Sequence, residues 1–247
     1  MDKALYISMS GAKQNMLSQQ AHANNLANVN TVGFKQDLAQ ARSMPVFGEY
    51  YPSRAYAMSE RPATDFDQGA LIETGRNLDV AVKGKGWLSV ESAEGNEALT
   101  RDGRLFIDAN SMLRTGSGLP VNGNGGPIFV PPADKVEIGQ DGTISIIPAG
   151  ASSTELAEID RIKLVNPSPD TIEKGLDGLI HLKPGAEEPD AEAEVQLESG
   201  FLESSNVSAV EAMTEIMSLA RQYELQVKVM QHADSNSESA ASLLRMS

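Results

Sequence analysis

Residues whose types could do chemistry are few and scattered in this 247-residue chain. Its three histidines, His22, His181 and His232, fall in separate predicted elements and lack the spacing of metal ligands. Cysteine is absent, which removes disulfides, thiolate nucleophiles and the common zinc sites. Serine is plentiful, but none lies in the Gly-x-Ser-x-Gly pattern of a nucleophile elbow.

Two stretches resemble ligand loops only in part. Residues 65–69 (Asp-Phe-Asp-Gln-Gly) hint at a calcium loop, but Ala70 stands where glycine is needed and Arg76 where a bidentate glutamate is needed. The glycine-rich run 123–127 lacks the Lys-Ser/Thr of a phosphate loop, so we expect a turn between strands. The sequence therefore predicts no catalytic, cofactor-binding or metal-binding residue, no small-molecule substrate and no enzyme.

The charge distribution limits the class of partner. The net charge is −14 and is carried by the interior of the chain, whereas each end is close to neutral. An acidic interior repels phosphate backbones, which argues against a nucleic acid partner. The chain contains no apolar run of about 18 residues, so no membrane-spanning helix is predicted. The first residues lack the pattern of a cleaved secretory signal.

Residues 3–28 are predicted to form a helix. Seven positions spaced four and three apart make a heptad seam, interrupted only by a glutamine. They are Leu5, Met9, Ala12, Met16, Gln19, Ala23 and Leu26. Asparagines then accumulate, and Gly33 is the expected residue of positive φ after the helix.

A second helix is predicted over 207–245, with Asn206 or Ser208 as its cap and Glu211 in a capping box. One apolar stripe contains Val210, Met213, Met217 and Ala220, and an adjoining stripe contains Ile216, Ala220, Tyr223, Val227 and Met230. Together they form a face too wide for one two-stranded seam, so we expect this helix to have more than one helical neighbour.

The region between the helices is predicted to be rich in strands. Residues 39–77 contain Pro and Gly without a steady period and are expected to be an extended connector with one short strand. Short Val- and Ile-rich runs follow. They cover 78–82, 87–91, 98–101, 104–107, 128–130, 136–138, 143–147, 161–165 and 179–182. Asp102-Gly103 and Asp141-Gly142 each lie between two runs, which predicts two hairpins.

These elements predict an α+β fold with two domains. A discontinuous, coiled-coil-like helical domain combines residues 1–38 and 204–247, and an all-β antiparallel domain (78–203) is inserted after the connector. Neither terminal helix has enough apolar surface to be stable alone in water. We therefore predict that the terminal helices become ordered by packing among copies of the chain. The predicted subunit interface consists of Leu5, Met9, Ala12, Met16, Ala23 and Leu26 of the first helix and the stripe residues Val210, Met213, Ile216, Met217, Ala220, Tyr223, Val227 and Met230 of the second.

Three classes of protein remain open at this point. The first is a structural subunit of a helical assembly. The second is a secreted β-rich binding module whose terminal helices form a stalk within one chain. The third is a hydrolase with an unrecognised pair of carboxylates, which requires a cleft and a strongly perturbed acid.

Four motifs resemble the rod and hook axial proteins of the bacterial flagellum. They are residues 24–35 (NNLANVNTVGFK), 78–87 (LDVAVKGKGW), 100–103 (TRDG) and 205–213 (SNVSAVEAM), the last followed by Arg221-Gln222-Tyr223-Glu224. They lie in the family's order over nearly the whole chain. The family-motif residues are Asn25, Leu26, Ala27, Asn28, Gly33, Phe34, Asn206 and Val207.

The resemblance implies paired terminal helices that line a tube, with a β domain outside. It implies assembly with copies of itself and with other flagellar rod proteins, export by the flagellar type III apparatus without a cleaved signal peptide, and a place in the periplasm-spanning rod of the basal body. Residues 210–214 (VEAMT) and the Met246-Ser247 ending resemble the proximal-rod members. The distal-rod members are the alternative, and hook proteins are typically longer.

Overall fold

The computed structural model describes residues 2–39, 41–45, 55–59, 63–148 and 156–245. The chain divides into two compact units, and each is described by itself. The helix-containing unit comprises residues 1–28, 36–65 and 207–247, and the strand-rich unit comprises 29–35 and 66–206. Each unit is therefore built from segments far apart in the sequence.

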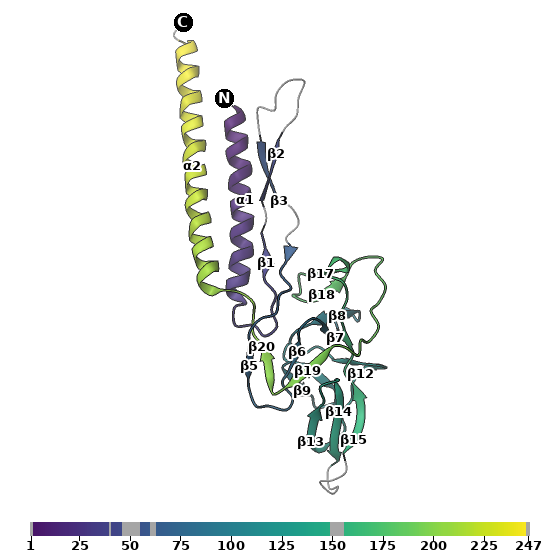
Figure 1. Cartoon of the computed structure of the whole chain (residues 1–247). Coiled ribbons are helices and arrows are strands. Elements are labelled where there is room, and N and C mark those ends of the chain that lie inside the picture. The colour runs from purple at the N-terminus through teal and green to yellow at the C-terminus, as the bar shows by residue number, and fades with distance from the viewer. Residues whose placement is uncertain (1, 40, 46–54, 60–62, 149–155, 246–247) are drawn as a thin grey trace. The chain divides into compact units, whose positions relative to one another are not determined.

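Two long helices dominate the helix-containing unit. Helix α1 (Asp2–Ala27) and helix α2 (Ala209–Arg245) pack side by side, with the two chain termini at the same end of the pair (Figure 1). The hydroxyl of Ser208 accepts a 3.4 Å hydrogen bond from the Glu211 amide, so Ser208, and not Asn206, is the N-cap of α2. Within the described residues, neither helix is both long and apolar enough to cross a membrane.

Strands occupy more of residues 39–77 than the sequence predicts. A hairpin of β2 (Ala41–Pro45) and β3 (Ala55–Ser59) packs beside α1, and β1 (Asp37–Leu38) pairs with β4 (Ala63–Thr64). Strand β5 (Leu71–Glu73) already belongs to the strand-rich unit. Residues 40, 46–54 and 60–62 of the expected connector lie outside the described residues.

The strand-rich unit contains only antiparallel pairs among its described strands. Its largest sheet has five strands in the order β16 (Leu164–Val165), β7 (Trp87–Glu91), β8 (Glu97–Thr100), β18 (Ile180–Leu182), β17 (Ile172–Lys174). A second sheet has the order β13 (Ala133–Ile138), β14 (Thr143–Pro148), β15 (Ala157–Arg161). A short 3-10 helix spans Pro169–Thr171.

Four two-stranded ribbons complete this unit. They pair β9 (Leu105–Ile107) with β10 (Leu113–Thr115), β11 (Asn122–Gly123) with β12 (Gly126–Pro127), β6 (Val80–Lys83) with β19 (Gln196–Ser199), and β5 with β20 (Phe201–Glu203). The main core gathers buried aliphatic side chains from most of these strands, including Val80, Leu88, Leu105, Ile144 and Leu197. A smaller cluster surrounds Trp87.

Two of the predicted turns are confirmed, and one predicted hairpin is wrong. Asp141-Gly142 joins β13 and β14 as predicted, and residues 124–125 form the turn between β11 and β12. The prediction of a hairpin at Asp102-Gly103 is wrong, because β8 pairs with β7 and β18 whereas β9 pairs with β10. Residues 128–130, predicted as a strand, contribute only an isolated bridge between Phe129 and Met112. Pairing with distant segments overrides the local turn signal.

Candidate functional site

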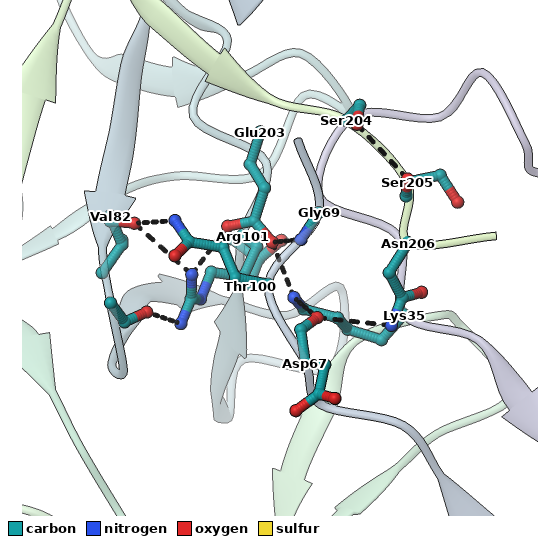
Figure 2. Close-up of polar contacts among 12 residues, drawn as sticks. Lys35, Asp67, Gly69, Val82, Thr100, Arg101, Glu203, Ser204, Ser205 and Asn206 are labelled. Atoms are coloured by element: carbon teal, nitrogen blue, oxygen red, sulfur yellow. Dashed lines mark hydrogen bonds and ion pairs between the residues drawn. The ribbon is translucent and has the colours of Figure 1, made fainter. Parts of the chain in front are cut away.

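Two buried cations of the strand-rich unit, Lys35 and Arg101, converge on the buried carboxylate of Glu203, at the end of β20. Its carboxylate accepts 2.6 Å hydrogen bonds from Lys35 Nζ and from an Arg101 guanidinium nitrogen, and a 3.0 Å bond from the Gly69 amide (Figure 2). The three charged side chains are at most 3% exposed. Breaking such a pair leaves an uncompensated buried charge, which makes each member costly to remove.

The cluster holds together the places where the chain enters and leaves this unit. Lys35 ends the segment 29–35, and Glu203 lies three residues before the unit ends at Asn206. The Gly33 amide donates to the Glu203 carbonyl at 2.8 Å, and the Asn206 amide donates to the Phe34 carbonyl at 3.4 Å. Lys35 Nζ also donates to the Asp67 carbonyl at 2.7 Å, at the start of the segment 66–206. The cluster therefore closes the unit at its ends.

Gly33 is required where these segments meet. Its φ is +68°, as the sequence predicts, and a Cβ there would lie 2.3 Å from the backbone carbon of Arg101. Any other residue would be strained and would push the Arg101 backbone away. The glycine thus permits the approach that brings Lys35 and Arg101 to one carboxylate.

An aromatic face and backbone carbonyl oxygens also lie against the two cations of the cluster. Trp87, the only tryptophan in the chain, places its ring centroid 5.2 Å from the Arg101 guanidinium carbon and 5.9 Å from Lys35 Nζ. Arg101 also donates to the Gly84 carbonyl at 2.7 Å. Every charge of the cluster thus has bonding partners from the chain itself, and the arrangement can hold segments together. It presents no free nucleophile or base.

Two aspartates near this motif have pKa values shifted in opposite directions. Burial raises the pKa of Asp102, which follows Arg101, despite hydrogen bonds and the attraction of Arg104. A hydrogen bond from Arg114, together with the Met112 amide, lowers the pKa of Asp108. A raised carboxyl pKa means that the folded chain binds the proton more tightly than the unfolded chain, and a lowered pKa means the reverse.

We expect Asp102→Asn to stabilise the strand-rich unit at pH 7 by about 0.5 kcal/mol. The gain should shrink as pH falls and vanish below about 4, the ordinary pKa of aspartate, because Asp102 is then protonated in both states. Asp108→Asn is the matched variant of opposite sign: it should destabilise at pH 7 and lose its effect only as pH falls through the depressed folded pKa. Urea unfolding followed by Trp87 fluorescence from pH 3 to 7 measures both. Parallel pH profiles for the two variants would contradict the prediction.

The family-motif residues lie at the ends of the two units. Asn25 is fully buried and exchanges two hydrogen bonds with the Asp37 backbone, 2.8 and 2.9 Å long, which fixes β1 to the end of α1. Asn28 bonds the Asn24 carbonyl at that helix end, and Asn206 donates to the Asp67 carbonyl. Leu26 is half-buried, Ala27 is exposed and Val207 is buried. Phe34 lies under Lys174 Nζ, 3.8 Å from its ring centroid.

The predicted interface residues divide between covered and open positions. Ala12 is buried, and Leu5, Leu26, Ile216, Ala220, Val227 and Met230 are half-buried. Exposed positions are Met9, Met16, Ala23, Val210, Met213, Met217 and Tyr223, with Met16 at 65% and Val210 at 74%. On α1 the buried positions also include Gln14, Asn15 and Ser18, which the predicted seam omits. The chain's own helix pair thus leaves the larger apolar side chains of α1 and one stripe of α2 open.

Sequence reasoning missed Glu203 altogether. Lys35 and Arg101 lie within quoted motifs, but nothing in the sequence marks them as partners. Glu203 follows Phe201 and Leu202 in a strand, and a charged residue there is ordinarily solvated. The available signal was weak: an acid ending an apolar run beside two small serines.

Three family models match this chain. The model described as "Flagella basal body rod protein" matches residues 5–35, and the model described as "Flagellar hook protein FlgE/F/G D1 domain" matches residues 81–146. The model described as "Flagellar basal body rod FlgEFG protein C-terminal" matches residues 198–243. The first and third matches contain Lys35 and Glu203, and the second contains Arg101 and Trp87. The chain belongs to this family of flagellar basal-body rod and hook proteins, and it is a structural subunit of the basal-body rod.

Among the relatives compared, FlgF proteins of two bacteria share more identical residues with the chain than an FlgG protein does. The chain is 38% identical to the flagellar basal-body rod protein FlgF of Escherichia coli (strain K12) and also 38% identical to FlgF of Salmonella typhimurium, with 100% of each chain covered. It is 30% identical to FlgG of Bacillus subtilis (strain 168), over 94% of this chain and 95% of the relative. The prediction of a rod subunit is confirmed, and the FlgF likeness exceeds that to this FlgG.

Proposed function

We propose that this subunit assembles into the proximal rod through the outward faces of α1 and α2. The observation that carries the proposal is the open apolar stripe on each helix: Met9 and Met16 on α1, and Val210, Met213 and Met217 on α2, all more than half exposed. Exposed apolar side chains in a row, and not scattered singly, are typical of an interaction surface.

The energy of such contacts is sufficient to drive assembly. Fully burying one side chain of this size contributes about 1.5–3 kcal/mol. Because these five side chains are between 51% and 74% exposed, burying the rest of them against neighbours could contribute roughly 4–9 kcal/mol. Interfaces between several copies then order both helices.

The proposal includes the domain organisation expected from the sequence. Residues 1–38 and 204–247 form one discontinuous, coiled-coil-like helical domain, and the strand-rich segment forms an all-β insert. The remaining predicted interface residues (Leu5, Ala12, Ala23, Leu26, Ile216, Ala220, Tyr223, Val227 and Met230) take part in contacts within and between subunits. The ionic cluster supports the proposal, because it fixes the ends of the insert to which both helices are joined.

We infer the cellular setting from membership in the family. The subunit is a component of a tubular shaft that spans the periplasm and transmits torque, and it has no enzymatic activity. Its partners are copies of itself and other rod and hook proteins, and it reaches the shaft through the flagellar export apparatus. A shaft built from many apolar helix contacts distributes load over all of them.

Hydrogen exchange on the dilute monomer tests this function. We expect amides in residues 1–40 and 205–247 to exchange rapidly and proteases to cut there, because these segments lack their neighbours. The strand-rich unit should stay protected, and assembly should protect both ends. Amide exchange resolved by mass spectrometry and limited proteolysis measure this.

The internal control is the strand-rich unit of the same sample, which reports any global unfolding. Strong protection of both ends in a dilute monomer would favour the alternative, a β-rich module whose helices form a stalk within one chain. Sedimentation of the full chain at rising concentration separates the two, since the alternative remains monomeric.

A further inference from the structure

The face on which α1 meets α2 is polar where an apolar seam is expected. Gly11 contacts Gln226: a Cβ at Gly11 would lie 2.5 Å from the amide atoms of the Gln226 side chain. Positions spaced three and four residues from Gly11 continue this face, and all are small or polar: Ser8, Gly11, Asn15, Ser18 and His22. We call these five residues the polar seam.

Polar atoms on this seam are buried without partners. Asn15 is 9% exposed, and among the described residues its Nδ2 has no hydrogen-bond partner; the same holds for Gln226 Oε1. The first atom is a donor and the second an acceptor, and Asn15 lies one helical turn from Gly11, on which the Gln226 amide rests. The two amides are chemically complementary, because one offers a donor and the other an acceptor.

Such a seam is poor at stabilising the helix pair. Leucine at these positions would bury more apolar surface and leave no unpaired polar atom. A polar residue at a core position of a helix pair reduces stability but selects one register and one partner, because other alignments bury it against apolar side chains.

We propose that Gln226, Gly11 and Asn15 are the residues that select the register and the partner helix of the α1–α2 pair. This inference rests on the proposed function, because the α1–α2 pair is the part of the subunit that is proposed to assemble. Gly11 is the only glycine between residues 2 and 27, so it is the one position of α1 that gives the Gln226 amide room without a Cβ. In a pair whose termini lie at one end, slipping α2 by a heptad moves Gln226 to Ala4 or Ser18 and moves Asn15 onto Ile216 or Met230.

Disulfide formation between engineered cysteines tests this in the full chain, which contains no other thiol. Ser18→Cys with Leu219→Cys lies one heptad along both helices from the Gly11–Gln226 contact and reports the native register. Ser18→Cys with Ala212→Cys reports the slipped register. Both pairs are oxidised at a concentration at which circular dichroism shows the helices formed, and single-chain and interchain products are separated by gel.

We expect the native pair to predominate in the otherwise unchanged chain. Gln226→Leu should raise the ratio of slipped and interchain products to native product by about tenfold while raising the melting temperature of the helices. Gly11→Ala displaces the Gln226 amide without harming helix formation, since alanine is the better helix former, and should raise the ratio as well. Gln222→Leu, exposed and one turn away on α2, is the matched control and should leave the ratio unchanged.

An unchanged ratio in Gln226→Leu and Gly11→Ala would overturn the inference, even if stability changes. A purely structural role moves the melting temperature alone, whereas selection of the register moves the ratio. The ratio is measured within the pair and does not require rod assembly. If the variants change the ratio of slipped and interchain to native disulfide products but the unchanged chain never assembles, the proposed function is contradicted and this inference is still supported.

Discussion

Glu203→Gln is expected to lower the free energy of unfolding of the strand-rich unit by about 3–5 kcal/mol. The substitution keeps the size of the side chain but removes the carboxylate that is ion-paired with Lys35 and Arg101, both of which remain buried. Since whole domains are stable by only about 5–15 kcal/mol, this loss brings the unit close to unfolding. Urea denaturation followed by the fluorescence of Trp87, whose ring contacts both cations, reports the change directly.

Two further variants separate charge balance from simple loss of a side chain. Glu73→Gln, at an exposed position of β5 opposite Phe201, makes the same chemical change beside the same strand and should have almost no effect. Replacing Lys35, Arg101 and Glu203 together by methionine should recover much of the loss, because no unpaired charge remains buried. Equal destabilisation by Glu203→Gln and Glu73→Gln would show that the cluster does not hold the unit together.

Met213→Asp combined with Met217→Asp is expected to abolish self-assembly of the full chain without changing the stability of the strand-rich unit. Both methionines are slightly more than half exposed in the helix pair, so the single subunit loses little. An assembled form would have to bury two carboxylates in place of two apolar side chains. Since only the exposed half of each methionine remains to be buried on assembly, about 0.8–1.5 kcal/mol is lost for each, and the concentration needed for assembly should rise by at least about tenfold.

Ser218→Asp combined with Gln222→Asp is the matched control for this variant. These two residues are exposed, are spaced four apart like the two methionines, and lie on another side of α2 than the apolar stripe. Sedimentation velocity over a concentration series, and motility of cells carrying each variant as the sole copy, measure assembly. If both double variants assemble like the unchanged chain, the stripe of Val210, Met213 and Met217 is not a subunit interface.

Local patterns in the sequence were sufficient to predict the elements that local physics determines. Two long apolar-periodic segments predicted α1 and α2 to within about two residues at their ends, which is the ordinary uncertainty of helix ends. The run 87–91 coincides with β7. Asp141-Gly142 forms the predicted hairpin between β13 and β14. Gly33 has the expected positive φ. Each of these depends on residues close together in the chain.

Contacts between distant segments escaped prediction for the same reason. Asp102-Gly103 carries a hairpin signal, yet β8 and β9 each find partners elsewhere, because the core formed by other strands decides their pairing. The strands within 39–77 lacked any period, and only their packing beside α1 or pairing with β20 accounts for them.

By itself, then, the sequence determined the α+β class, the terminal helices, the absence of a recognisable catalytic motif and, through its motifs, the flagellar rod family. The tertiary structure decided which faces of those helices stay open and which charges are buried together. Lys35, Arg101 and Glu203 are separated by 66 and 102 positions, and no local rule connects them. Their attraction acts only after folding has excluded water from around them, so its strength depends on burial, which a linear pattern does not contain.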